Sequence, residues 1–162
     1  MPLFGMNGAT ISIVAYNYGA RQPRRMMKTL KIALGVALTL MTTGLAAFQL
    51  IPQVLLGMFN PSEEFLQIGC TALRVISLHF PIAAIGIILG ASFQALGNGI
   101  YSTITSLTRQ LIVLLPAAYL LSLSGKVDLV WWAFPIAEVF SCAATLFFFI
   151  KLYRQKVKPL FS

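Results

Sequence analysis

Residues 15–31, AYNYGARQPRRMMKTLK, decide how the rest of the chain is oriented, because they end one apolar segment and begin the next under a run of positive charge. Five basic residues make up this run: Arg21, Arg24, Arg25, Lys28 and Lys31. No acidic residue accompanies them. Cytoplasmic loops of membrane proteins carry an excess of lysine and arginine, and this bias sets the topology. We therefore expect residues 21–31 to form a basic cytoplasmic loop, from which each later membrane crossing can be counted.

The composition is that of a protein embedded in a bilayer. Of the 162 residues, 58% are hydrophobic and 10% are charged, and the mean hydropathy is +0.84. A membrane-crossing helix needs roughly 20 mostly apolar residues. We predict an all-α integral membrane helical bundle. Nine of the twelve basic residues flank membrane segments on the same predicted side, which argues for topology and against a nucleic-acid-binding surface.

The apolar runs divide the chain into one partial helix and four full spans. Residues 1–20 are short and contain two asparagines, so we interpret them as the end of a helix whose beginning precedes the sequence; a re-entrant or interfacial segment is the alternative. The predicted membrane helices are residues 32–56, 65–96, 100–123 and 129–150, followed by a basic cytoplasmic tail at 151–162. Ser62 is a candidate N-cap, and residues 97–99, Gly-Asn-Gly, predict a tight turn.

Prolines and glycines interrupt these spans. Each full span contains one proline: Pro52, Pro81, Pro116 and Pro135. Proline removes a backbone donor and kinks a helix, which suits a transporter, although membrane helices also tolerate proline without such a role. Residues 86 and 90 form a G-x-x-x-G pair that allows close approach of another helix.

Glu138 is the acidic residue that lies within an apolar span, about seven residues past a tryptophan pair. That distance is roughly 10 Å along a helix, so we expect the carboxyl group to be buried. An ionisable group at this depth suggests function. It could bind a proton or an organic cation, or it could form a structural pair with Arg109. Arg109 itself could turn into the bundle or extend towards the inner interface.

Neutral polar side chains form the remaining candidate binding group. Gln94, Asn7 and Asn17 could line an aqueous path, and hydrogen bonding between helices is the alternative for each. The sequence has no metal-ligand cluster, nucleophile–base arrangement or phosphate loop, so we predict no metal site, no cofactor and no enzyme activity. Cys70 and Cys142 are interpreted as structural thiols.

Several of these segments together resemble one family. The order PLFGMNGATISIVAYNYGA, RQPRRM, SFQALGNG, SLTRQ with Pro116, and WWAFPIAE before a basic tail resembles the C-terminal part of multidrug and toxic compound extrusion (MATE) transporters. The resemblance covers essentially the whole chain. It implies the end of helix eight and helices nine to twelve, part of the C-terminal lobe of a 12-helix transporter.

The resemblance also implies a function and its partners. The chain would belong to a secondary active multidrug efflux antiporter that exports cationic or amphipathic compounds in exchange for Na⁺ or H⁺. Its partners would be the lipid bilayer, such small compounds and an N-terminal lobe that is missing from this sequence. It would be a multi-pass protein of the plasma (inner) membrane with a cytoplasmic C-terminus. The alternatives are a stand-alone four-helix protein acting as a homo-oligomeric drug/proton exchanger around Glu138, and a non-transporting scaffold or remnant.

Overall fold

The computed structural model describes residues 2–161, and every regular element in that range is helical. The all-α prediction is therefore confirmed. In chain order the elements are α1 (Pro2–Gly19), α2 (Pro23–Leu50), α3 (Pro52–Gly57), α4 (Glu63–Ser77), α5 (Phe80–Ala95), α6 (Gly99–Leu107), the π-helical segment η1 (Thr108–Leu114), α7 (Leu115–Ser122), α8 (Val127–Val130), α9 (Ala133–Leu152), the π-helical segment η2 (Tyr153–Val157) and the short 3₁₀ segment η3 (Lys158–Leu160).

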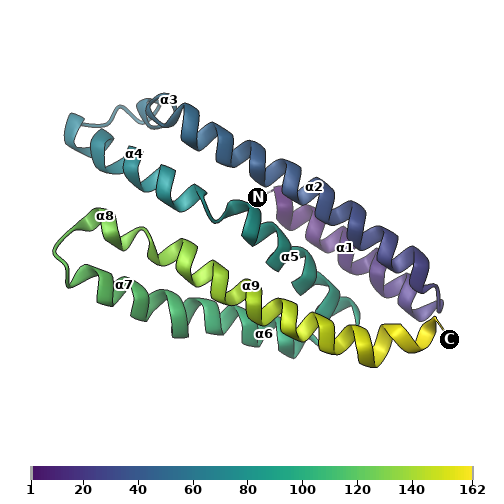
Figure 1. Cartoon of the computed structure of the whole chain (residues 1–162). Helices are drawn as coiled ribbons and strands as arrows, with labels where there is room; N and C mark the ends of the chain where they lie inside the picture. The colour runs from purple at the N-terminus through teal and green to yellow at the C-terminus, as the bar shows by residue number, and fades with distance from the viewer. Residues whose placement is uncertain (1, 162) are drawn as a thin grey trace.

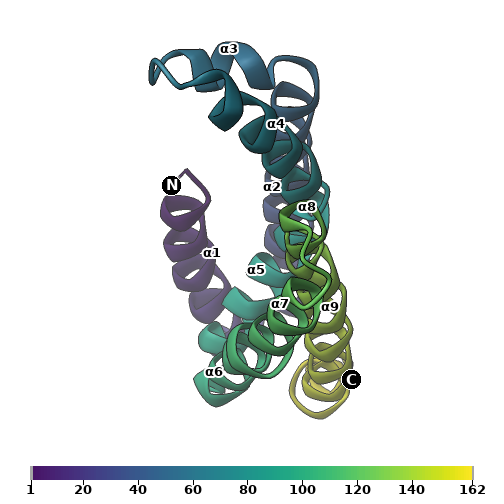
Figure 2. The same cartoon turned by 90° about the vertical axis from the view of Figure 1, so that its left-hand side faces the viewer.

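The long helices lie roughly along one axis, with α5 at the centre (Figure 1). Helix α5 packs against α1, α2 and α9, and the continuous path α6–η1–α7 packs against α9. In Figure 2, α1 and α9 stand on opposite sides of the view, and α5 lies behind and between them. The main core lies where α1, α2 and α5 meet and includes Val14, Met26 and Ile88.

Within residues 2–161, three helical stretches are long and apolar enough to cross a membrane: Pro23–Leu50, Gly99–Ser122 and Val127–Leu160. The α4–α5 pair is a fourth crossing if it is one span, bent by 48°. Between 6% and 33% of the most apolar part of each continuous span is buried within the chain. Apolar side chains therefore point outward, as expected for helices surrounded by lipid or by further protein.

The predicted loop at residues 21–31 is wrong, because α2 begins at Pro23. Proline is accepted in the first turn of a helix, where its missing N–H has no partner to lose. Arg21, with φ of 52°, makes the turn, and the Gln22 N–H donates to the Asn17 carbonyl at 2.9 Å. The other four basic residues of the run lie on the first turns of α2.

The spans predicted as 32–56 and 65–96 are both broken. Helix α2 ends at Leu50, and Ile51 has φ of −128° because a residue before proline avoids the helical region. The second break lies between α4 and α5, just before Pro81, where the proline ring and its missing N–H interrupt the helix. Gln49 joins the two breaks: its Nε2 donates to the Arg74 carbonyl at 2.8 Å. Ser62 caps α4 as predicted, accepting from the Phe65 N–H at 3.3 Å.

The last two predicted spans also differ from the structure. Residues 100–123 contain η1, because Pro116 lacks an N–H and the i→i+5 pattern of a π-helix lets a carbonyl bypass it. The last helical path begins before residue 129 and extends through most of the predicted tail to Leu160. Lys156 Nζ donates to the Leu96 carbonyl at 2.8 Å, which supplies a partner at the C-terminal end of α5. The predicted turn after α5 is present, with Gly97 at φ +73°.

Candidate functional site

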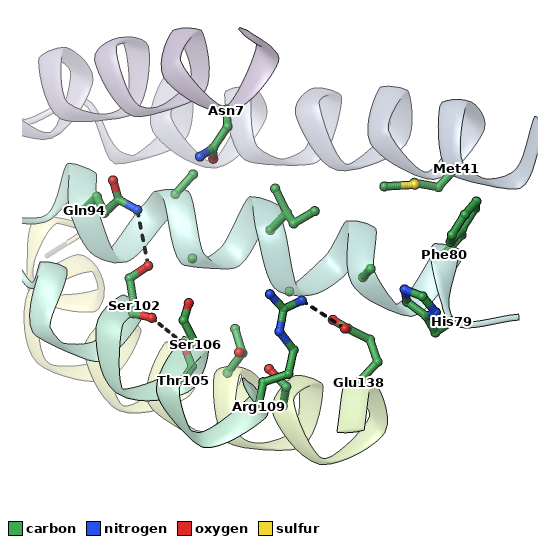
Figure 3. A pocket seen from close by; sticks show the side chains of 17 residues that line it. Asn7, Met41, His79, Phe80, Gln94, Ser102, Thr105, Ser106, Arg109 and Glu138 are labelled. Carbon is green, nitrogen blue, oxygen red and sulfur yellow. Dashed lines mark hydrogen bonds and ion pairs between the residues drawn. The ribbon is translucent and has the colours of Figure 1, made fainter. Parts of the chain in front are cut away.

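A cavity of about 370 Å³ opens between the central helix and its neighbours. Its walls come from α1, α2, α5, α6, η1 and α9 (Figure 3). Met41, Phe80 and Ile87 supply apolar surface, whereas most other lining side chains from α6, η1 and α9 are polar. A mostly apolar site with a few convergent polar groups is the usual form of a small-molecule site.

One face of α5 forms the central wall. Gly86, Gly90 and Gln94 are spaced four residues apart and all line the cavity. A Cβ at Gly86 would lie 3.5 Å from Glu138 Oε1, and a Cβ at Gly90 would lie 3.7 Å from Ser102 Oγ. The G-x-x-x-G pair therefore makes room for polar side chains of neighbouring helices rather than only for close backbone packing.

The α6–η1 path supplies a row of polar groups at helical spacing. Ser102, Ser106 and Arg109 line the cavity at positions i, i+4 and i+7. Gln94 Nε2 donates to Ser102 Oγ at 3.2 Å, which joins this row to α5 (Figure 3). Because Arg109 lies in the π-helical segment, its direction is set by the local irregularity as well as by its position in sequence.

Glu138 on α9 is 4% exposed and pairs with Arg109. Arg109 Nη1 donates to Glu138 Oε2 at 3.1 Å, and this is the sole ion pair within residues 2–161. The two partners differ in environment: the Arg109 side chain is 38% exposed and that of Glu138 is 6% exposed. The guanidinium group thus covers a carboxylate that has little other access to solvent.

The ion pair also stands between two cavities. A second cavity of about 180 Å³ shares His79, Arg109 and Glu138 with the first and extends towards Phe134 and Leu114. The His79 ring stacks on Phe134 with centroids 6.3 Å apart. Within the described residues, His79 Nδ1 is buried without a hydrogen-bond partner. A change at the ion pair would therefore alter the wall between these two spaces.

The structure brings together four of the five residues selected from the sequence. Glu138, Arg109, Gln94 and Asn7 line one cavity. Asn7 points towards it from α1 in Figure 3, and its Oδ1 is buried without a partner in the described part of the chain. Asn17 does not line this cavity; its Nδ2 donates to the Ile13 carbonyl of its own helix at 2.8 Å.

Other lining residues were not selected from the sequence. Five of them line the cavity although the sequence did not single them out: His79, Ser102, Ser106, Ser141 and Thr145. The spacing of Ser141 and Thr145 from Glu138, i+3 and i+7, carried a usable signal, since such residues share one helix face.

The site offers hydrogen bonds and one ion pair for binding. Among the described residues, no group of three or more His, Cys, Asp or Glu side chains is placed to hold a metal ion. Cys70 and Cys142 are free thiols. The chemistry available at the cavity is recognition of a small molecule or ion by an apolar wall, neutral polar groups and a carboxylate already paired with a cation.

Comparison with known proteins places this arrangement in context. The MatE family model matches residues 1–120. The solved structure of the MATE multidrug transporter DinF-BH in complex with rhodamine 6G is 35% identical, with a TM-score of 0.84, and the match covers 97% of this chain and 35% of that one. An inward-facing multidrug resistance MATE family transporter of the MOP superfamily shares the fold, with a TM-score of 0.84, 22% identity and coverage of 98% of this chain and 36% of that one.

An outward-facing structure of a multidrug resistance MATE family transporter of the MOP superfamily is also similar in fold. Its TM-score is 0.84 at 22% identity, and the match covers 98% of this chain and 35% of that one. No curated protein sequence matches the chain. The chain therefore spans about a third of the length of the solved transporters that it resembles.

Proposed function

This chain belongs to the MatE family of multidrug transporters, and we propose that it forms part of the C-terminal lobe of a secondary active efflux antiporter. The antiporter would export cationic or amphipathic compounds in exchange for Na⁺ or H⁺. The observation that carries the proposal is the buried Glu138 carboxylate on the wall of a cavity with apolar and neutral polar lining. Intramembrane ionisable groups typically mark substrate and ion pathways.

The Arg109–Glu138 pair suggests how two ligands would exclude each other. Because Arg109 already neutralises the carboxylate, a substrate cation, a sodium ion or a proton would gain access only as the guanidinium moves away. Competition for one carboxylate makes occupancy by substrate and by coupling ion mutually exclusive, which is the basic requirement of exchange. Asn7 and Gln94 would orient polar groups of the substrate, while Phe80 and Met41 would contact its apolar body.

A partner lobe would complete the transport pathway. Alternating access in transporters built from repeats moves one half against the other around a central site. The chain covers 35–36% of the solved transporters, and much of its apolar surface is unburied. We propose that the N-terminal lobe of the same transporter covers the cavity. A stand-alone homo-oligomeric exchanger or a non-transporting remnant is not favoured, because 97% of the chain aligns with part of one transporter at 35% identity.

The charge distribution supports an orientation in the membrane. The basic residues of the α1–α2 turn and of the C-terminal segment lie at one end of the helices (Figure 1). By the positive-inside rule we propose that this end, with the C-terminus, is cytoplasmic. We also propose that the membrane is the bacterial-type inner membrane.

Binding of the dye rhodamine 6G tests the proposal. The 162-residue chain is purified in detergent, and dye binding is followed by fluorescence anisotropy. Glu138→Gln is expected to weaken binding by about tenfold, since it removes the charge of the cavity carboxylate. Glu64→Gln, at the exposed start of α4, is the matched control and leaves binding unchanged. Equal dye affinity in wild type and Glu138→Gln would contradict the assignment of the carboxylate.

The same assay identifies the coupling ion. Sodium ions at constant pH, or protons at constant sodium concentration, should weaken dye binding if they compete for Glu138. Dye binding that responds to neither ion would refute the exchange mechanism while leaving the cavity itself as a binding site.

A further inference from the structure

Positive charge is concentrated at one end of the molecule, on residues that do not line the cavity beside Glu138. Nine of the twelve basic residues lie on the α1–α2 turn, the first turns of α2, the end of α9 and the segments after it. The four acidic residues lie elsewhere: two begin α4, one is in α8, and Glu138 is within α9. Figure 1 places α4 and α8 at the end opposite the C-terminus.

An apolar groove of about 390 Å³ lies at this basic end. Its floor is made by Met27 of α2 with Phe149, Ile150 and Tyr153 of the α9–η2 path, and its rim carries Arg154 and Lys158. Phe149 and Tyr153 form a tilted ring pair with centroids 6.3 Å apart, which gives the floor a broad aromatic surface. An apolar floor with a cationic rim matches the two parts of a phospholipid, its acyl chain and its phosphate.

A second cavity of about 420 Å³ lies at the α1–α2 turn, where Arg21, Arg24 and Arg25 face Leu160 and Phe161 of the C-terminal segment. Both hollows therefore lie where the start of α2 meets the end of the chain, and both combine cations with apolar side chains.

The cations around these hollows are exposed and form no ion pair with another described residue. Arg24, Arg25, Arg154 and Lys158 are all exposed. Within residues 2–161 the one ion pair is Arg109–Glu138, so none of these four is ion-paired with another described residue. Guanidinium groups bind phosphate through paired hydrogen bonds, and unpaired basic residues at the membrane surface attract anionic headgroups.

We propose that this end of the chain binds an anionic phospholipid. One acyl chain lies on the groove floor formed by Met27, Phe149, Ile150 and Tyr153, and the phosphate is held at the rim by Arg154 and Lys158. The neighbouring arginines of the α1–α2 turn add positive potential. A soluble phosphate would leave the apolar floor uncovered, and a zwitterionic lipid would leave the net positive charge unbalanced. The bound lipid would join the C-terminal segment to the start of α2, independently of any transport activity.

Native mass spectrometry of the detergent-solubilised 162-residue chain tests this site. The chain is titrated with dioleoylphosphatidylglycerol and, in parallel, with dioleoylphosphatidylcholine. Wild type is expected to retain the anionic lipid at least about tenfold more strongly, because each basic residue near an anionic headgroup contributes about fivefold in affinity. The double variant Arg154→Ala/Lys158→Ala should lose this preference.

Two further variants distinguish specific binding of the lipid in the groove from general electrostatic attraction to the basic end. Lys28→Ala/Lys31→Ala removes the same charge from the same end but from residues that line neither hollow, so phosphatidylglycerol binding should be unchanged. Ile150→Trp keeps every charge but fills the groove floor, and it should weaken phosphatidylglycerol binding as much as the rim variant. Circular dichroism verifies that each variant keeps its helix content.

The opposite outcomes overturn the proposal. Equal loss in the rim variant and the Lys28/Lys31 variant would mean unspecific attraction to the basic end. Unchanged lipid binding in Ile150→Trp would remove the acyl chain from the groove. If sn-glycerol 3-phosphate competes as effectively as the intact lipid, the site is one for soluble phosphate compounds.

Discussion

Removing either partner of the Arg109–Glu138 ion pair is expected to lower the free energy of unfolding by a different amount. Glu138 is 4% exposed, whereas the Arg109 side chain is 38% exposed. Arg109→Met keeps the length of the side chain but leaves a buried carboxylate without its partner, which should cost about 3–5 kcal/mol. Glu138→Gln leaves a guanidinium group that still reaches the open cavity. The free energy of unfolding of this variant should therefore fall by only about 1 kcal/mol, as for a partly exposed pair.

The two variants are compared through reversible unfolding of the purified chain in mixed micelles, titrated with dodecyl sulfate and followed by circular dichroism. Combining them should cost less than the sum of the single changes, because the double variant has no unpaired charge. Arg74→Met, which removes an exposed cation that has no ion pair with another described residue, controls for the change in net charge. The reasoning is refuted if Glu138→Gln destabilises as much as Arg109→Met, or if the double-variant coupling is near zero.

Three other substitutions test the cavity and the contacts that position it. Gly86→Leu places a side chain in the cavity beside the ion pair and should weaken rhodamine 6G binding about tenfold through overpacking. Gly35→Leu has open space at its Cβ and should leave binding unchanged. Fluorescence anisotropy measures the dye affinity of both variants. Lys156→Met removes the 2.8 Å hydrogen bond to the Leu96 carbonyl at the end of α5 and should lower the free energy of unfolding by about 1.5–3 kcal/mol. Lys151→Met is the control and should be near neutral in the same dodecyl sulfate titration. Gln49→Leu removes the bond between the end of α2 and the α4–α5 bend, and hydrogen exchange at the bend should accelerate about tenfold.

Hydropathy located the apolar helical stretches because it is a local property of the chain. Four full spans were predicted, and the described residues form three continuous helices long enough to cross a membrane, or four crossings if the bent α4–α5 pair is one span. A run of about 20 apolar residues is readable wherever it occurs. The ends of the helices were less accessible. The basic residues after Arg21 were assigned to a loop, yet lysine and arginine are good helix formers, and Pro23 is a favourable first helical residue. Charge thus predicts a side of the membrane for this turn, but it does not indicate where the helix begins.

For the prolines as well, the local effect on the helix was predictable and the long-range hydrogen bonds were not. Their presence predicted breaks, and α2–α3 and α4–α5 are broken next to Pro52 and Pro81. The sequence did not reveal how the freed carbonyl groups find partners. Gln49 reaches the carbonyl of a residue 25 positions later, which requires knowing that two helix ends meet.

Glu138 was recognisable because an acid in an apolar span is costly wherever it points. The sequence left open whether Arg109 turns into the bundle or extends to the interface. In the structure Arg109, 29 residues away, is the partner of Glu138. His79 was missed because it lies at the break between α4 and α5, and its neighbours in sequence give no indication of Glu138, although both residues line both cavities. Such pairings depend on the rotation of each helix about its axis, and side-chain spacing within one helix fixes only relative directions.

The rotation of Arg109 depends further on an irregular stretch of backbone. A π-helix has a wider turn than an α-helix, so each residue within Thr108–Leu114 advances by a smaller angle, and all side chains after it are displaced around the axis relative to those before it. Ser102 and Ser106 precede this segment and Arg109 lies inside it, yet the three face one cavity. Pro116 lies two residues beyond this segment, and a change that restored a regular α-helix over Thr108–Leu114 would rotate Arg109 relative to Glu138. Because Arg109 lies in this segment and lines the cavity, the irregular backbone forms part of the cavity wall.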